Sequence, residues 1–178
     1  MSNKSNNFKN DRAMKKTIVV YGSTTGTCQE FAEQIAQKLG MSDVMNVAEM
    51  SADTLAGYDN LLLGTSTWGA GELQDDWYDG VEALKSVDLS GKTIAIFGCG
   101  DADGYGDTFC GGMAEIYNAV KDSDAKVIGQ VAADTYQYGD SEAVVDGKFV
   151  GLALDCSESE GKSENRIDDW LDSIRAKL

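Results

Sequence analysis

The chain is predicted to fold as an α/β protein with a parallel sheet between two layers of helices. Short β-branched runs such as 17–21 alternate with amphipathic stretches such as 27–39 along most of the 178 residues. The apolar runs lack a polar-apolar alternation, which is typical of strands that helices cover on both faces. A chain of this length fits one domain with a substantial core.

The expected elements follow one another in a regular order along the chain. Strands are expected at 17–21, 43–47, 58–64, 93–98 and from 126 to 131. Helices are expected at 27–39, 75–84, 108–120 and, from the apolar periodicity, at 167–178. Residues 1–13 are polar and without periodicity, so they are predicted to be a disordered extension or an expression remnant, with the domain at 14–178.

Composition restricts the chemistry that the chain can perform alone. It contains no histidine, which excludes Ser-His and Cys-His nucleophiles and makes common zinc sites improbable. Any reaction is therefore expected to depend on a cofactor. The four cysteines show no CxxC spacing, and no apolar run is long enough for a signal peptide or membrane span, which favours reduced thiols and a cytoplasmic location.

The net charge of −15 restricts the partners. Such a field repels nucleic acid and anionic membranes, so neither is an expected partner. A basic protein partner is compatible with the charge, but acidity that merely aids solubility explains it equally well.

The first loop after a predicted strand has the composition of a phosphate site. It consists of Ser23, Thr24, Thr25, Gly26, Thr27 and Cys28 at the start of a helix. Hydroxyl groups and free backbone N–H groups at a helix start can hold a phosphate, although the same residues also cap helices. No Lys or Arg lies between Lys16 and Lys38, so the lysine of a nucleoside triphosphate loop is absent and one monoester phosphate fits better.

Two further loops each carry an aromatic side chain where ligands of parallel sheets bind. Trp68 lies among small residues in the loop 65–73, and Tyr105 lies between two glycines in the loop 98–108. Each could stack on a planar ring, although Trp68 could instead cover the core and Tyr105 could be an exposed loop residue. Taken with the first loop, they predict a site for a phosphorylated planar ring system.

Four segments in this order resemble a flavodoxin of the long-chain type. They are Ser-Thr-Thr-Gly-Thr at 23–27, Ser-Thr-Trp-Gly with the residues that follow it at 66–77, Gly-Asp with Gly-Tyr at 100–105, and Asp-Gly-Lys-Phe-Val-Gly-Leu-Ala-Leu-Asp at 146–155. The resemblance implies a flavodoxin-like three-layer sandwich. Its five-stranded parallel sheet would have the order 2-1-3-4-5, with the last strand split by an insertion near 132–148. One non-covalent FMN is implied.

The resemblance also implies which residues bind the cofactor. The phosphate would be held by residues 23–28, with Cys28 standing where the family usually has threonine. The ring would be flanked by Trp68 and Tyr105. The remaining implied contacts come from Ser66, Thr67, Gly69, Ala70, Gly71, Cys99, Gly100, Asp101 and Asp107. The Gly69-Ala70 peptide would turn toward flavin N5 and favour the neutral semiquinone.

The function implied by the resemblance is electron transfer rather than catalysis. Acidic residues around both ring loops are expected to disfavour the anionic reduced flavin, giving a low-potential one-electron carrier that cycles between semiquinone and hydroquinone. A monomer serving redox proteins such as ferredoxin-NADP reductase or pyruvate oxidoreductases is expected. The alternatives are an FMN-dependent quinone or NAD(P)H reductase and, without redox chemistry, a receiver-type signalling module.

Overall fold

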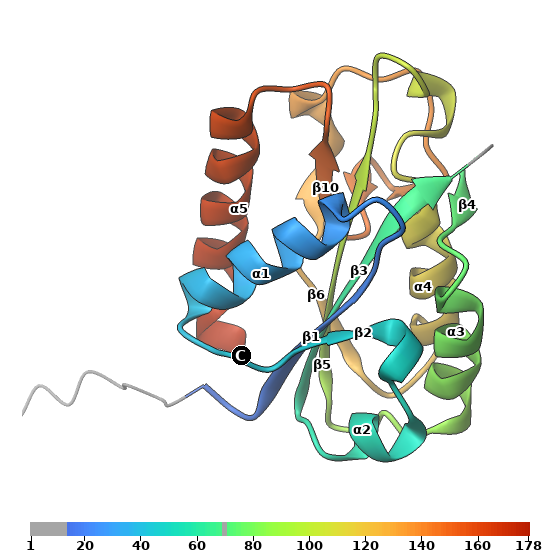
Figure 1. Cartoon of the computed structure of the whole chain (residues 1–178), viewed down its shortest axis with the longest axis vertical. Coiled ribbons are helices and arrows are strands. Elements are labelled where there is room, and N and C mark those ends of the chain that lie inside the picture. Colours follow the sequence, from blue (N-terminus) through green and yellow to red (C-terminus); the bar gives the residue numbers. More distant parts are fainter. Residues whose placement is uncertain (1–13, 69–70) are drawn as a thin grey trace, which may run out of the picture.

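A computed structural model describes residues 14–68 and 71–178, which form three layers with a parallel sheet in the middle (Figure 1). The main path of the sheet has the order β2-β1-β3-β5-β10. These strands are β1 (Thr17–Gly22), β2 (Val44–Asn46), β3 (Asn60–Trp68), β5 (Thr93–Gly100) and β10 (Leu152–Asp155). The predicted order 2-1-3-4-5 is therefore confirmed.

Helices cover both faces of the sheet. Figure 1 shows α1 (Thr27–Leu39) and α5 (Glu160–Ile174) on one side, and α3 (Trp77–Ser86) and α4 (Gly112–Val120) on the other. Alternate residues of β1 pack in opposite directions, with Val19 in the α1/α5 core and Ile18 and Val20 in the α3/α4 core. This two-sided burial explains why the strand is apolar throughout.

The last strand is split, as predicted. Its first part, β6 (Lys126–Ile128), pairs with β5 at Thr93–Ala95, and its second part, β10, pairs with β5 at Phe97–Gly100. The residues between them form a small antiparallel sheet of β7 (Val131–Ala132), β9 (Lys148–Phe149) and β8 (Val144–Val145). Tyr136 and Phe149 pack edge to face there, with ring centroids 4.8 Å apart.

Some element boundaries differ from the prediction. Strand β3 continues to Trp68 because the short β4 (Glu72–Leu73) pairs back onto it antiparallel. The helix expected at 108–120 begins only at Gly112, after a 3₁₀ turn at Gly106–Thr108 and a positive φ of 51° at Cys110. The short helix α2 (Ala52–Ala56), which begins with a capping box, was not predicted.

The smaller elements complete the chain. Three further 3₁₀ turns lie at Val47–Glu49, Ala133–Thr135 and Arg175–Lys177. Within the two described ranges, no helix has the length and apolar character needed to cross a membrane.

Candidate functional site

A cavity of about 190 Å³ opens where β3 and β5 end, beside the loop from β1 to α1. Its wall contains residues of all three predicted loops, of the segment between β10 and α5, and of the turn before α4. They are Thr25, Thr27, Ser66, Thr67, Trp68, Cys99, Gly100, Asp101, Tyr105, Thr108, Phe109, Cys110 and Cys156. The structure thus brings the three loops together at the carboxyl edge of the sheet, where doubly wound proteins bind ligands.

The start of α1 offers backbone N–H groups without a side-chain cap. Gly26 is the N-cap residue, with a left-handed φ of 93°, and no side chain of the described residues caps the helix. Ser23 instead accepts a hydrogen bond from the Gly26 N–H at 3.1 Å, which closes the loop on itself. The amides of the first helical turn are therefore left for another acceptor.

Gln74, which follows β4, and Trp77, the first residue of α3, contact this loop. The Gln74 amide, only 2% exposed, donates to the Thr24 hydroxyl at 3.2 Å. A Cβ at Gly22 would lie 2.4 Å from Trp77, so glycine is needed for the close approach. The contacts of Gln74 and Trp77 with the first loop were not predicted, because they span 50 residues or more.

The two aromatic side chains are large, exposed and at the rim of the cavity. Trp68 is 39% exposed and Tyr105 is 64% exposed. The Trp68 ring is oriented by its Nε1–H, which donates to the Ser66 hydroxyl at 2.9 Å. Burial of Trp68 in the core, one of the two readings of the sequence, is thus not what the structure shows.

The loop after β5 is shaped by Asp101. Its carboxylate accepts hydrogen bonds from the backbone N–H groups of Asp103 and Gly104, both at 3.0 Å. The Tyr105 N–H donates to the Asp101 carbonyl at 2.8 Å, so Tyr105 closes the turn beside the cavity.

The predicted residues do not all line the cavity. Ser23, Thr24, Gly26, Cys28, Gly71 and Asp107 lie outside its wall, and Gly69 and Ala70 lie outside the described residues. Cys28 is fully buried in the α1/α5 core, so only its backbone is placed to contribute to the loop. Four lining residues were not predicted: Thr108, Phe109, Cys110 and Cys156.

The thiols at the cavity are held in the protonated form. The pKa of Cys156 is raised by its hydrogen bond with Cys99 and by burial. Burial also raises the pKa of Cys110 well above its ordinary value. Among the residues that the structure describes, no cluster of Cys, Asp and Glu could hold a metal ion.

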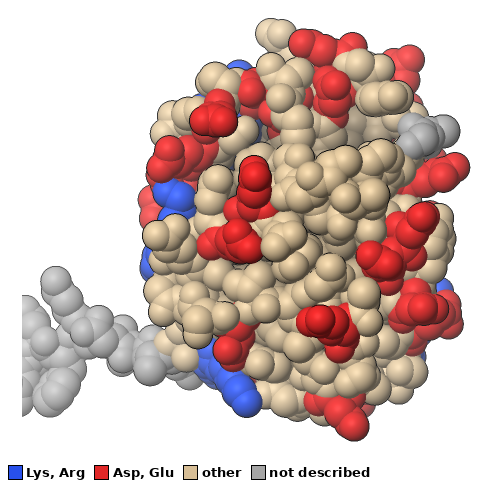
Figure 2. Space-filling model, in the orientation of Figure 1, with Lys and Arg blue, Asp and Glu red and all other residues tan. Residues whose placement is uncertain are grey.

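The charge around the cavity is acidic, and no Lys or Arg among the described residues lines it. Of the described residues that line the wall, Asp101 is the one that is charged. On the face drawn in Figure 2, Asp and Glu cover the upper end and the side formed by α3. Most of the visible Lys and Arg lie near the α1/α5 edge and at the lower end. A ligand phosphate would therefore meet neutral donors and the α1 dipole.

The fold is that of a doubly wound α/β protein, and its candidate site combines an uncapped helix start with two exposed aromatic rings. The family model for flavodoxins matches residues 19–170, and the chain therefore belongs to the flavodoxin family.

Relatives and solved structures agree with this assignment. The flavodoxin of Picosynechococcus is 38% identical, over 91% of this chain and 97% of its own. Flavodoxin 1 of Azotobacter vinelandii is 39% identical, over 89% and 94% of the two chains. The crystal structure of Fusobacterium nucleatum flavodoxin bound to flavin mononucleotide superposes with a TM-score of 0.85 at 30% identity, covering 93% and 99%.

Proposed function

We propose that this chain binds one FMN non-covalently in the cavity and carries single electrons between redox proteins. The observation that supports this most directly is the pairing of the uncapped α1 start with the exposed rings of Trp68 and Tyr105 around one cavity. The similar Fusobacterium protein is described with flavin mononucleotide bound.

The residues fit a flavin phosphate and ring. The hydroxyls and amides of residues 23–28 would hold the phosphate, and Trp68 and Tyr105 would flank the ring. Backbone groups of Cys99, Gly100 and Asp101 would contact its polar edge, with Ser66, Thr67, Gly71 and Asp107 supporting the two ring loops. Bound FMN supplies the one-electron chemistry, which the side chains of this chain lack.

The acidic side chains near the cavity support a low reduction potential for bound FMN and a protein partner with a basic surface. An added negative charge is disfavoured near carboxylates such as Glu72, Asp101 and Asp103. The same carboxylates would steer partners such as ferredoxin-NADP reductase or pyruvate oxidoreductases to this face. We propose a cytoplasmic monomer, in agreement with four free cysteines and no disulfide in the described chain.

A stepwise redox titration of the FMN-loaded protein tests this function. Flavin fluorescence should be quenched on binding, and a one-electron-reduced spectrum should accumulate before full reduction. Direct two-electron reduction by NADPH would instead indicate a reductase. Electron transfer to a basic partner should slow as salt rises, and indifference to ionic strength would refute the steering role of the acids.

A further inference from the structure

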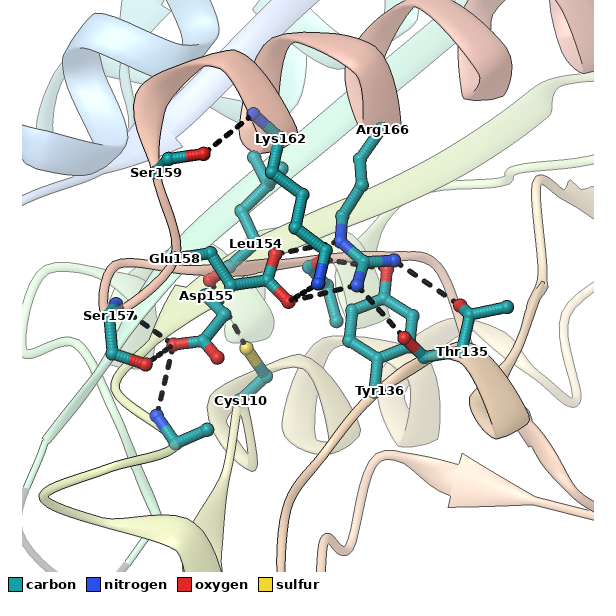
Figure 3. Close-up of polar contacts among 12 residues, drawn as sticks. Cys110, Thr135, Tyr136, Leu154, Asp155, Ser157, Glu158, Ser159, Lys162 and Arg166 are labelled. Atoms are coloured by element: carbon teal, nitrogen blue, oxygen red, sulfur yellow. Dashed lines mark hydrogen bonds and ion pairs between the residues drawn. The ribbon is translucent and has the colours of Figure 1, made fainter.

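Asp155, the last residue of β10, is a buried carboxylate without a basic partner. It is 4% exposed, and none of the ion pairs formed by the described residues includes it. Its Oδ1 accepts three hydrogen bonds, from the Ser157 hydroxyl at 2.6 Å, the Ser157 N–H at 2.9 Å and the Ala102 N–H at 3.1 Å. Figure 3 shows the carboxylate directed toward Ser157. These donors compensate the cost of burying the charge.

The bond to Ala102 links two segments that are 53 residues apart. Ala102 lies in the turn that Asp101 shapes and that presents Tyr105 to the cavity. Within residues 14–68 and 71–178, the Ala102–Asp155 bond is the one hydrogen bond between the turn 101–105 and a side chain outside the turn. The other bonds of the turn are internal to it or lead to its immediate neighbours.

The position of Asp155 follows from the sheet. Asp155 is paired with Gly100 in the parallel ladder, and the next residue, Cys156, donates its N–H to the Gly100 carbonyl at 2.8 Å. The backbone pairing ends at this point, while the chain of β5 continues into the turn. A side-chain acceptor on β10 is therefore what extends the contact between the two segments beyond the ladder.

We infer that Asp155 is a positioning residue for the ring site: it holds the 101–105 turn, and with it Tyr105, through the Ala102 N–H. This inference rests on the proposed FMN function, because that function gives the turn its ligand. It concerns the hydrogen-bond acceptor rather than the charge, so an amide oxygen at the same place should serve.

Two variants of the full-length chain separate the acceptor from the charge. Asp155→Asn keeps a side-chain oxygen that can accept the bond from the Ala102 N–H, whereas Asp155→Ala removes it. Asp172→Ala, at an exposed position of α5, controls for loss of a carboxylate elsewhere. Hydrogen exchange of the Ala102 amide is measured in the FMN-free chain, and the FMN dissociation constant is measured by fluorescence quenching.

The alanine variant should exchange the Ala102 amide at least about tenfold faster and bind FMN about tenfold more weakly, because the Ala102 N–H loses its acceptor. The asparagine and Asp172→Ala variants should remain within about threefold of the parent in both measurements. Unchanged Ala102 exchange in Asp155→Ala, or an asparagine variant as impaired as the alanine variant, would overturn the inference. Failure of the parent chain to bind FMN would refute the proposed function alone, since the exchange measurement does not need the flavin.

Discussion

Replacing Arg166 by alanine tests the contact that fastens the insertion to α5. The guanidinium donates to both oxygens of Glu158, at 2.9 Å each, and to the Thr135 carbonyl at 3.1 Å (Figure 3). It also lies 3.7 Å from the centre of the Tyr136 ring. One residue thus joins the β10–α5 turn to the insertion.

The expected cost of Arg166→Ala is about 2 kcal/mol of unfolding free energy. Breaking a fully buried ion pair costs about 3–5 kcal/mol. The side chains of Arg166 and Glu158 are 12% and 13% exposed, and Lys162 still reaches Glu158 at 3.1 Å, so the cost should fall below that range.

Tyr136, which the guanidinium covers, has a hydrogen bond of its own. Burial raises the pKa of Tyr136 to about 12, so its hydroxyl stays protonated and keeps its bond to the Ala153 carbonyl.

Urea unfolding of the FMN-free chain measures the cost, because bound flavin would add its own stabilisation. Lys85→Ala is the matched control, since its pair with Glu82 is 3.7 Å long and mostly exposed, and it should cost less than about 0.5 kcal/mol. If Arg166→Ala were no more costly than this control, the interpretation of the pair as a stabilising contact would be wrong.

The cost should also depend on pH with a defined sign. The hydrogen bond with Arg166 lowers the pKa of Glu158 below its ordinary value of 4.5 in the folded chain. The stabilisation is therefore fully present above the unfolded pKa and is lost as the pH falls through the lowered folded pKa. The difference between parent and Arg166→Ala should be constant near neutrality and shrink below about pH 4.5. A difference that grew on acidification would contradict the assignment.

Two further substitutions can each be compared with a matched control substitution elsewhere in the chain. Gly64→Ala would place a Cβ 2.1 Å from the Phe97 ring and should lower the free energy of unfolding in urea by about 1–3 kcal/mol. Gly161→Ala, in open space on α5, should be neutral or stabilising. Equal effects of the two substitutions would refute the steric argument. Trp68→Ala should weaken FMN binding about tenfold in a fluorescence titration while Tyr78→Ala, exposed on α3, leaves it unchanged, and an unaffected Trp68 variant would remove the ring-stacking role.

The sheet could be predicted because its strands carry local signals. The run 17–21 is buried on both faces in the structure, and the stripe on α1 faces the core as its periodicity requires. The sheet order and the split strand were expected from the resemblance, and the pairing of β6 and β10 with β5 confirms the split.

The parts that could not be predicted depend on contacts between distant segments. Cys156 reaches the cavity because β10 ends beside Gly100, a register that no local pattern reveals. Gln74 supports the first loop across 50 residues. The burial of Cys28 follows from its side of α1, a position that the helical stripe from Ala32 to Leu39 could have indicated.

A few polar side chains of the framework hold two loops of the site and the insertion in place. Thr24 and Ala102 lie in two loops of the site, and Thr135 lies in the insertion. Each forms a hydrogen bond with one side chain from a distant segment: Gln74, Asp155 and Arg166, respectively. Loops at a ligand edge expose their backbone and cannot bury enough apolar surface to order themselves. Buried or partly buried polar anchors can supply that order without filling the cavity. Substitutions at Gln74 and Asp155 should therefore affect loop exchange and ligand affinity more strongly than their effect on global unfolding would suggest.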